Sequence, residues 1–264
     1  MYQARTLFRD REKVSALKVC KLTIAPRHFH SMRPHGTLRG MEQALESIAA
    51  QINACRLCPL AAQRTHAVPG EGNPRAEVLF VGEGPGKNED EQGRPFVGAA
   101  GKFLDEMLAS VGWQRSDVFI TNVVKCRPPG NRDPEESEIK TCCTTYLVRQ
   151  VACIDPKLIV TLGRHSMKWF LKNPEPISRI HGRLKLVTDK KTGHAQFILP
   201  LYHPAAALYN GGQRKIHLDD FKKIPLILEK IKSSAINAAV DLPVNKEIAD
   251  SSDDTMKQNR LDIF

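Results

Sequence analysis

The stretch AEVLFV at residues 76–81, followed directly by Gly82-Glu83-Gly84-Pro85-Gly86, indicates the fold. Its apolar residues are nearly continuous, as in a strand whose sheet is covered on both faces. Three similar runs follow at residues 118–124 (VFITNVV), 158–162 (LIVTL) and 197–201 (FILPL). Helical patterns occupy residues 99–111, 134–154, 163–171 and 215–232. This alternation predicts an α/β protein, with a parallel sheet in a three-layer α/β/α domain.

Composition limits the class of protein. Hydrophobic residues make up 41% and charged residues 26% of the 264, which excludes a wholly disordered chain, a collagen and a coiled-coil rod. No apolar run approaches the length of a membrane helix. The N-terminal residues lack the apolar stretch of a secretory signal, so we expect none, and the seven cysteines are an odd number, so we expect a reducing, cytoplasmic location. A net charge of +10 favours a polyanionic partner.

The charge divides the chain into three segments. Residues 1–40 are strongly basic and weakly periodic, which predicts a flexible extension, with Met41 as an alternative start. Organised sequence begins with a helical pattern there, so residues 41–232 are expected to form the folded domain. Residues 233–264 are polar and acidic, the composition of a disordered linker.

Five cysteines, of which four could converge, have a spacing that suggests a metal centre. Cys55 and Cys58 form a CxxC motif, Cys126 follows the second strand, and Cys142 and Cys143 lie in the next helix. Zinc usually draws on two short ligand pairs, whereas scattered thiolates fit a [4Fe–4S] cluster better. The alternative is that Cys126 and Cys142 are buried packing thiols. Cys20 and Cys153 are not expected to bind the metal centre.

The loops after the strands contain the other candidate site residues. The glycines of residues 82–86 would let the backbone approach a ligand closely, but neither a dinucleotide nor a Walker motif is present. Phe96 is either a core plug or a stacking platform. Asn122 offers a donor and an acceptor, which suits the edge of a pyrimidine, or it caps a turn. His203 begins His-Pro-Ala-Ala-Ala-Leu after the fourth strand.

Together these motifs resemble the type 4, iron–sulfur branch of the uracil-DNA glycosylases. The resemblance rests on GEGPGKNEDEQGRPFVGAAG, NVVKCRPPGNRDP, LIVTLG and HPAAAL, with CxxC upstream, and covers roughly residues 41–232. It implies a four-stranded parallel sheet, a [4Fe–4S] cluster and the removal of uracil from DNA, in a prokaryotic, mainly thermophilic or archaeal, family. We expect a monomer that acts on the DNA of the cytoplasm.

The resemblance also implies which residues act. The cluster ligands would be Cys55, Cys58, Cys126 and Cys142. Cys143 is the alternative to Cys142, because the chain has one extra residue just after the pair.

The residues that the resemblance implies for substrate binding lie in the loops that follow the strands. Phe96 would stack on the flipped uracil, Asn122 would read its Watson–Crick edge, and His203 would lie near uracil O2. Glu83 and Glu89 match the two acids of the first motif, of which Glu83 is preferred, and Gly84 lies beside the substrate.

The physical chemistry agrees with this interpretation. A buried base must be flipped out of the stack before its glycosidic bond can be cleaved. His203 and Asn122 would then stabilise the leaving uracil anion, and an acid would position water or face the sugar cation. The cluster is expected to be structural, and to hold Lys125 and Arg127 near DNA phosphates.

Two other classes of function compete with this one. The first is a non-catalytic iron–sulfur or zinc DNA-binding protein on the same fold. The second is a flavodoxin-type nucleotide-binding protein, which would bind a flavin or a phosphate.

The C-terminus suggests a partner. Gln258, Leu261 and Phe264 are spaced as in the sliding-clamp binding motif QxxLxxFF, although the chain stops before the second aromatic. Spacings of three place Leu261 and Phe264 on one side of a helical turn that could enter a hydrophobic groove. The alternative is a frayed terminus with chance apolar residues.

Overall fold

The computed structural model describes residues 37–188, 194–209 and 211–238. Its strands are β1 (Glu71–Gly72), β2 (Val78–Gly82), β3 (Phe119–Asn122), β4 (Leu158–Leu162), β5 (Lys185–Thr188) and β6 (Ala195–Leu201). Its α-helices are α1 (Leu38–Ala54), α2 (Lys87–Gln92), α3 (Ala99–Ala109), α4 (Glu136–Cys142), α5 (Val148–Ile154), α6 (Arg164–Phe170), α7 (Ile177–Ile180), α8 (Ala206–Tyr209), α9 (Gly211–Phe221) and α10 (Ile224–Ala238). Shorter turns are the 3₁₀ helices η2 (Pro59–Ala62), η3 (Arg115–Asp117) and η4 (Pro129–Asn131), and the π-helical η5 (Cys143–Leu147).

The structure confirms the α/β class, and its sheet is larger than the one expected. Its order is β1-β3-β2-β4-β6-β5, so it has six strands and not the four that the resemblance implied. The four strands expected from the apolar runs are its centre, where β3, β2, β4 and β6 pair in parallel. The edge strands β1 and β5 pair antiparallel to their neighbours. The loops that follow the central strands therefore meet at one edge of the sheet.

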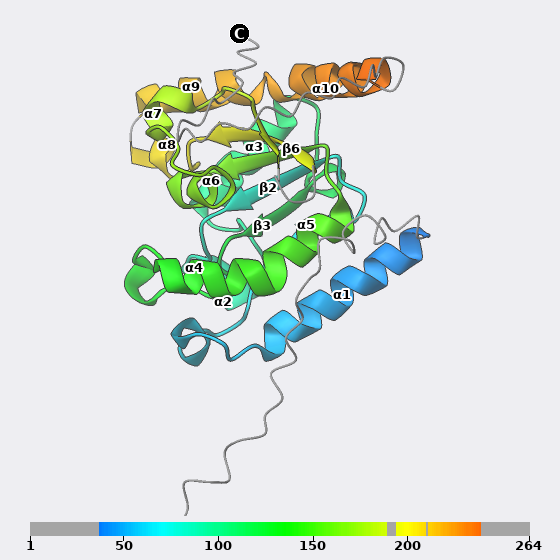
Figure 1. Ribbon diagram of the computed structural model, residues 1–264. Coiled ribbons are helices and arrows are strands. Elements are labelled where there is room, and N and C mark those ends of the chain that lie inside the picture. The colour runs from blue at the N-terminus through cyan, green and yellow to red at the C-terminus, as the bar shows by residue number, and fades with distance from the viewer. Residues whose placement is uncertain (1–36, 189–193, 210, 239–264) are drawn as a thin grey trace, which may run out of the picture.

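Both faces of the sheet are covered by helices, which explains why its strands are apolar without a break. Along β2, Val78 and Phe80 pack in the cluster formed with α3, α9 and α10, whereas Leu79 and Val81 pack in the cluster formed with α1, α4, α5 and α6. Figure 1 shows α9 and α10 on one side of the sheet and α1, α4 and α5 on the other. Burying each large apolar side chain contributes about 1.5–3 kcal/mol.

Two of the expected helices are interrupted. The pattern at residues 134–154 forms α4 and α5 with the π-helical turn η5 between them. The pattern at residues 215–232 spans α9 and α10, which meet at residues 222–223. The π-helical turn η5 begins at Cys143, the second cysteine of the pair.

The folded domain begins slightly before Met41. Helix α1 starts at Leu38, where the Thr37 side chain accepts a hydrogen bond from the Gly40 N–H at 3.4 Å. Met41 itself is buried. Residues 1–36 of the expected extension and residues 239–264 of the expected linker lie outside the described residues. Within the described ranges, every helix is too short or too polar to cross a membrane.

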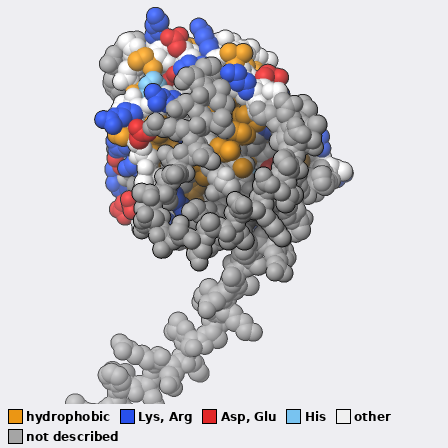
Figure 2. Space-filling model, turned by 45° about the horizontal axis from the view of Figure 1, so that its top comes forward, with side chains coloured by type: hydrophobic (Ala, Val, Ile, Leu, Met, Phe, Trp, Pro, Cys, Tyr) orange, Lys and Arg blue, Asp and Glu red, His pale blue; other side chains and the backbone are white. Residues whose placement is uncertain are grey.

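Charge is mixed on the face that contains α9 and α10. Figure 2 shows lysine and arginine side chains next to acidic ones among the described residues of this face. For example, Lys223 forms an ion pair with Asp220. Lys232 forms ion pairs with Glu77 and Glu229. Each of these two lysines therefore has at least one acidic partner.

Candidate functional site

A cleft of about 330 Å³ lies where the loops after β2, β3 and β6 converge. It brings together every substrate residue expected from the sequence. Its lining consists of Glu83, Gly84, Pro85, Gly86, Glu89, Phe96, Ala100, Asn122, Pro128, Asn131, Arg132, Pro134, His203 and Ala205. These residues come from separate parts of the chain, so the parallel sheet itself assembles the cleft.

Asn122 is the last residue of β3 and is only 1% exposed. Its Oδ1 atom is buried, and no described residue donates a hydrogen bond to it. A buried acceptor without a partner is costly, which points to a ligand that supplies the donor. Opposite it lies Gly82, where a Cβ atom would stand 2.4 Å from this oxygen and 2.5 Å from Phe96 Cζ. Glycine is therefore needed to leave room for both side chains.

Phe96 belongs to the core and to the cleft at once. It packs in the cluster with α3 while its ring lines the cleft. The ring lies 5.7 Å from that of His203, at an interplanar angle of 28°. Its backbone has a φ of +52°, a left-handed conformation that is strained for an aromatic residue. The structure confirms that Phe96 packs in the core, and stacking on a ligand stays a prediction.

His203 follows β6 and is a neutral hydrogen-bond donor toward the cleft. Burial, with a smaller effect of nearby His217, lowers the pKa of His203 to about 4. Its Nδ1 atom accepts a hydrogen bond from the Ala205 N–H at 3.2 Å. A neutral imidazole that accepts at Nδ1 has its proton on Nε2. The side chain can therefore donate one hydrogen bond to a ligand oxygen without being charged.

Glu83, directly after β2, lies beside two residues that sequence reasoning missed. Its Oε1 is 3.8 Å from His165 Nε2, which is 3.6 Å from Asp133 Oδ1. One ligand atom from each of the three lies within 4.8 Å of the others. Burial and the Asp133 charge raise the pKa of Glu83 to about 7, and Arg164, which is paired with Asp133, opposes this. His165 follows β4, so its place after a strand was the available signal.

Glu89 is held by backbone groups. One carboxylate oxygen accepts hydrogen bonds from the N–H groups of Val97 and Gly98, both at 2.8 Å. The other accepts one from the Gly86 N–H at 3.1 Å. Glu89 thereby ties the glycine loop after β2 to the segment that follows Phe96. Both of its oxygens are engaged, unlike the carboxylate of Glu83.

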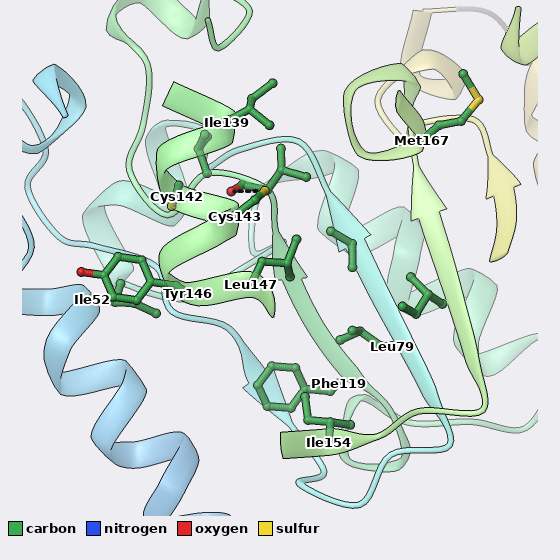
Figure 3. Close-up of a cluster of buried hydrophobic side chains, with 14 of the residues drawn as sticks. Ile52, Leu79, Phe119, Ile139, Cys142, Cys143, Tyr146, Leu147, Ile154 and Met167 are labelled. Atoms are coloured by element: carbon green, nitrogen blue, oxygen red, sulfur yellow. Dashed lines mark hydrogen bonds between the residues drawn. The ribbon is translucent and has the colours of Figure 1, made fainter. Parts of the chain in front are cut away.

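Four cysteines from three regions line a second, small cavity. They are Cys55, Cys58, Cys126 and Cys142, with Arg64 and Tyr146 among their neighbours. Cys143 is not in this lining, and its Sγ donates a hydrogen bond to the Val123 carbonyl at 3.3 Å, drawn as a dashed line in Figure 3. The two neighbouring cysteines thus point in different directions from the helix.

The sulfurs of the described cysteines are not gathered as around a single zinc ion. Among the described residues, no three cysteine sulfurs lie within 4.8 Å of one another. Tetrahedral zinc with Zn–S bonds of about 2.3 Å holds its sulfurs only ~3.8 Å apart. Burial raises the pKa of Cys58 and Cys126, and that of Cys142 to about 11, so free thiolates would be unfavourable without a metal centre.

The expected contact of Lys125 with DNA phosphates is wrong. Lys125 is only 1% exposed, and its Nζ donates to the Thr121 hydroxyl and, at 2.8 Å, to the Asn122 carbonyl. Burial lowers its pKa to about 8. The ammonium group instead braces the end of β3 beneath Asn122. Arg127 is partly exposed and donates to Asn131 Oδ1 at 2.8 Å.

Comparisons with known proteins show the family of the chain. The uracil DNA glycosylase superfamily matches residues 69–225. Type-4 uracil-DNA glycosylase of Sulfurisphaera tokodaii is 54% identical over 186 residues, covering 69% of this chain and 83% of the relative. The type-4 enzyme of Archaeoglobus fulgidus is 47% identical, and the match covers 69% of this chain and 92% of the relative. The type-4 enzyme of Thermotoga maritima is 39% identical, and the match covers 72% of this chain and 97% of the relative. The chain therefore belongs to the uracil-DNA glycosylase superfamily, in its type-4 branch.

Proposed function

We propose that this protein is a uracil-DNA glycosylase, which hydrolyses the N-glycosidic bond of deoxyuridine in DNA. The products are free uracil and an abasic site, so the reaction initiates base excision repair of deaminated cytosine. The observation that supports this best is the unpaired Oδ1 of Asn122 in a cleft that also contains a neutral donor, His203. Because the relatives come from archaea and bacteria, we expect the enzyme to act on the chromosome in the cytoplasm of a prokaryotic cell.

The cleft residues divide the work of holding the base. The flipped uracil lies against the Phe96 ring, since every base has a π-face that stacks on an aromatic. Asn122 Oδ1 accepts the N3–H of uracil, and its amide NH₂ donates to a neighbouring carbonyl. Cytosine has an acceptor at N3, so the same oxygen would be left unpaired against it. Gly84, without a side chain, leaves the backbone close to the base.

Bond cleavage needs stabilisation of opposite charges on the two products. Negative charge develops on the uracil oxygens, where His203 Nε2–H and the Asn122 amide donate. Positive charge develops on the sugar, which the Glu83 carboxylate can face while it orients water. Glu89 acts by fixing the glycine loop relative to Phe96, because its oxygens already accept three backbone hydrogen bonds.

A uracil-release assay tests the proposal directly. Duplexes with U:G and U:A pairs are incubated with the protein, and strand scission at the abasic site is measured after alkali. A matched C:G duplex is the control. Release of uracil from both substrates is expected without added metal or nucleotide. Binding of either duplex without release would instead identify a DNA-binding protein on this fold.

Glu83 should give the activity and the stability a pH dependence. The carboxylate form predominates above about pH 7, so the rate should rise with pH through about 7 and then level off. The unfolded chain releases this proton near 4.5, so the favourable contribution of protonated Glu83 to folding is lost as pH rises from 4.5 through 7. Glu83→Gln should therefore remove the step in rate and raise the melting temperature at pH 8.

The control for this prediction is Asp133→Asn, which removes the repelling charge and should move the step in rate to lower pH. Thermal unfolding at pH 4 and pH 8 gives the second readout. At pH 4 the melting temperatures of Glu83→Gln and wild type should agree. An equal difference at both pH values would contradict the assignment of this pKa.

We propose that Cys55, Cys58, Cys126 and Cys142 hold a [4Fe–4S] cluster. When bound, the cluster supplies a cross-link between chain segments and no step of the hydrolysis. Those segments are the end of α1, the loop after β3 and the end of α4. Arg64 supports the same corner, because its guanidinium donates to Cys126 Sγ at 3.0 Å and to the Cys55 carbonyl at 3.1 Å. These donors would offset the negative charge of the thiolates.

We also propose that residues 258–264 bind a sliding clamp through Gln258, Leu261 and Phe264. These residues lie outside the described ranges, so the support is the sequence motif and the DNA substrate. A chain ending at Lys257 should lose clamp binding in a calorimetric titration and keep its uracil release in the absence of clamp. Leu261→Ala with Phe264→Ala is the matched full-length control. Equal clamp binding by the full-length and shortened chains would remove the hypothesis.

A further inference from the structure

The strained backbone of Phe96 is fixed from outside the cleft by Arg115. Arg115 lies in η3, just before β3, and is not part of the cleft lining. Its guanidinium donates to the carbonyl of Phe96 at 3.2 Å through Nη1 and to that of Pro95 through Nη2. One planar guanidinium group thus binds two successive backbone carbonyls.

The guanidinium is itself held on its other sides. Nε donates to Glu71 Oε1 at 3.0 Å, and Nη1 also donates to Asp105 Oδ1 at 3.0 Å. Glu71 belongs to the edge strand β1, and Asp105 belongs to α3. Hydrogen bonds from Arg94 and Arg115 lower the pKa of Glu71 despite its partial burial, so this carboxylate stays charged. Arg115 therefore has little freedom to release the two carbonyls.

Helix α3 packs closely against the same Phe96 peptide. A Cβ atom at Gly101 would lie 1.8 Å from the Phe96 carbonyl oxygen. The peptide is thus in contact with both a helix and a guanidinium, and such over-determination by the surroundings is the condition under which a strained conformation persists. The conformation in turn directs the ring to the cleft, where it lies next to His203.

We propose that Arg115 is a positioning residue for uracil cleavage, which acts by holding Phe96 in the left-handed conformation that presents its ring to the flipped base. This inference rests on the proposed function, in which Phe96 stacks on uracil. The competing explanation is that Arg115 only stabilises the domain through its ion pairs with Glu71 and Asp105. The two explanations differ in whether the effect of Arg115 requires the Phe96 ring.

Arg94 provides a matched control. It forms a two-pronged ion pair with the same Glu71, at 2.8 and 3.0 Å. No hydrogen bond joins its guanidinium to the Pro95 or Phe96 carbonyl among the described contacts. Arg94→Ala therefore removes a charge and a Glu71 contact, and it leaves the hydrogen bonds from Arg115 to the Pro95 and Phe96 carbonyls in place.

The test is a double-mutant cycle in single-turnover uracil release. Arg115→Ala should lower the rate about 10-fold or more, comparable to Phe96→Ala, since stacking on a base is worth that much. Affinity for uracil-free DNA should change less than 3-fold, an estimate of roughly 0.6 kcal/mol or less for a residue outside the cleft. The double variant should be no slower than Phe96→Ala alone, because both changes remove one interaction. Arg94→Ala should be close to wild type.

Arg115→Lys separates positioning from folding. It keeps the charge beside Glu71, but one ammonium group cannot reproduce the planar fork. We expect a near wild-type melting temperature with a reduced release rate. Additive effects of Arg115→Ala and Phe96→Ala, or equal losses in Arg94→Ala and Arg115→Ala, would overturn the inference. A wild-type protein that releases no uracil would contradict the proposed function instead.

Discussion

Replacing either Asn122 or His203 by alanine should lower the rate of uracil release by about 10²–10³-fold, the usual effect of removing one donor to a developing anion. Both side chains reach the cleft from the end of a central strand, and each can donate a hydrogen bond to the leaving uracil. Neither change should unfold the domain, because both side chains face the cleft. The measurement is single-turnover release from a U:G duplex, with melting temperatures taken in parallel.

Asn131→Gly is the control for the Asn122 change. Asn131 lines the same cleft, but its amide oxygen already accepts a hydrogen bond from Arg127. Its φ of +56° is one that glycine adopts readily, so the substitution causes little backbone strain. We expect a small loss of rate in this variant. Unchanged release in Asn122→Ala and His203→Ala would contradict the assigned roles of both residues.

The pH dependence distinguishes the His203 role from that of Glu83. The pKa of His203 is about 4, so the imidazole stays a neutral donor over the range in which Glu83, with a pKa of about 7, changes its charge. Any loss of rate between pH 8 and pH 6 should therefore disappear in Glu83→Gln. A cationic histidine would hold the leaving anion more strongly in the product complex, whereas a neutral donor releases it more easily.

The central strands could be predicted because burial on both faces leaves a continuous apolar run. The edge strands could not. β1 has two residues, Glu71 and Gly72, and is defined only by its pairing with β3. β5 alternates between partly buried and exposed side chains, including Leu186 at 44% exposure, within a basic and turn-rich stretch. Such strands depend on a partner supplied by the rest of the fold.

The cleft residues could be predicted because parallel strands end at one edge, and motif loops follow those ends. The supporting residues were harder to foresee. Whether Lys125 reaches DNA or turns inward depends on the space beneath β3, which a basic loop sequence does not reveal. Arg115 acts on neighbours that are distant along the chain, so no local pattern marks it, and Asp133 stands in a quoted motif without any sign there that it lies beside Glu83. His165 could have been predicted, because it follows β4 and ligands bind beyond the ends of parallel strands.

The cysteine pair allows the sharpest test of the metal centre. Cys142→Ala should abolish iron incorporation and the broad absorbance near 400 nm, because its side chain lines the cavity with Cys55, Cys58 and Cys126. Cys143→Ala should keep both. Its thiol instead donates to the Val123 carbonyl within the core, so the loss is one weak hydrogen bond and a small buried volume.

Iron content per chain and the melting temperature are the two readouts. Cys153→Ala, which removes a half-buried thiol in α5, is the control for handling and oxidation. The Cys142 variant should also melt at a lower temperature, since the cluster would join α1, the loop after β3 and α4, and a ligand that binds only the folded state stabilises it. Loss of iron in Cys143→Ala with retention in Cys142→Ala would reverse the ligand assignment.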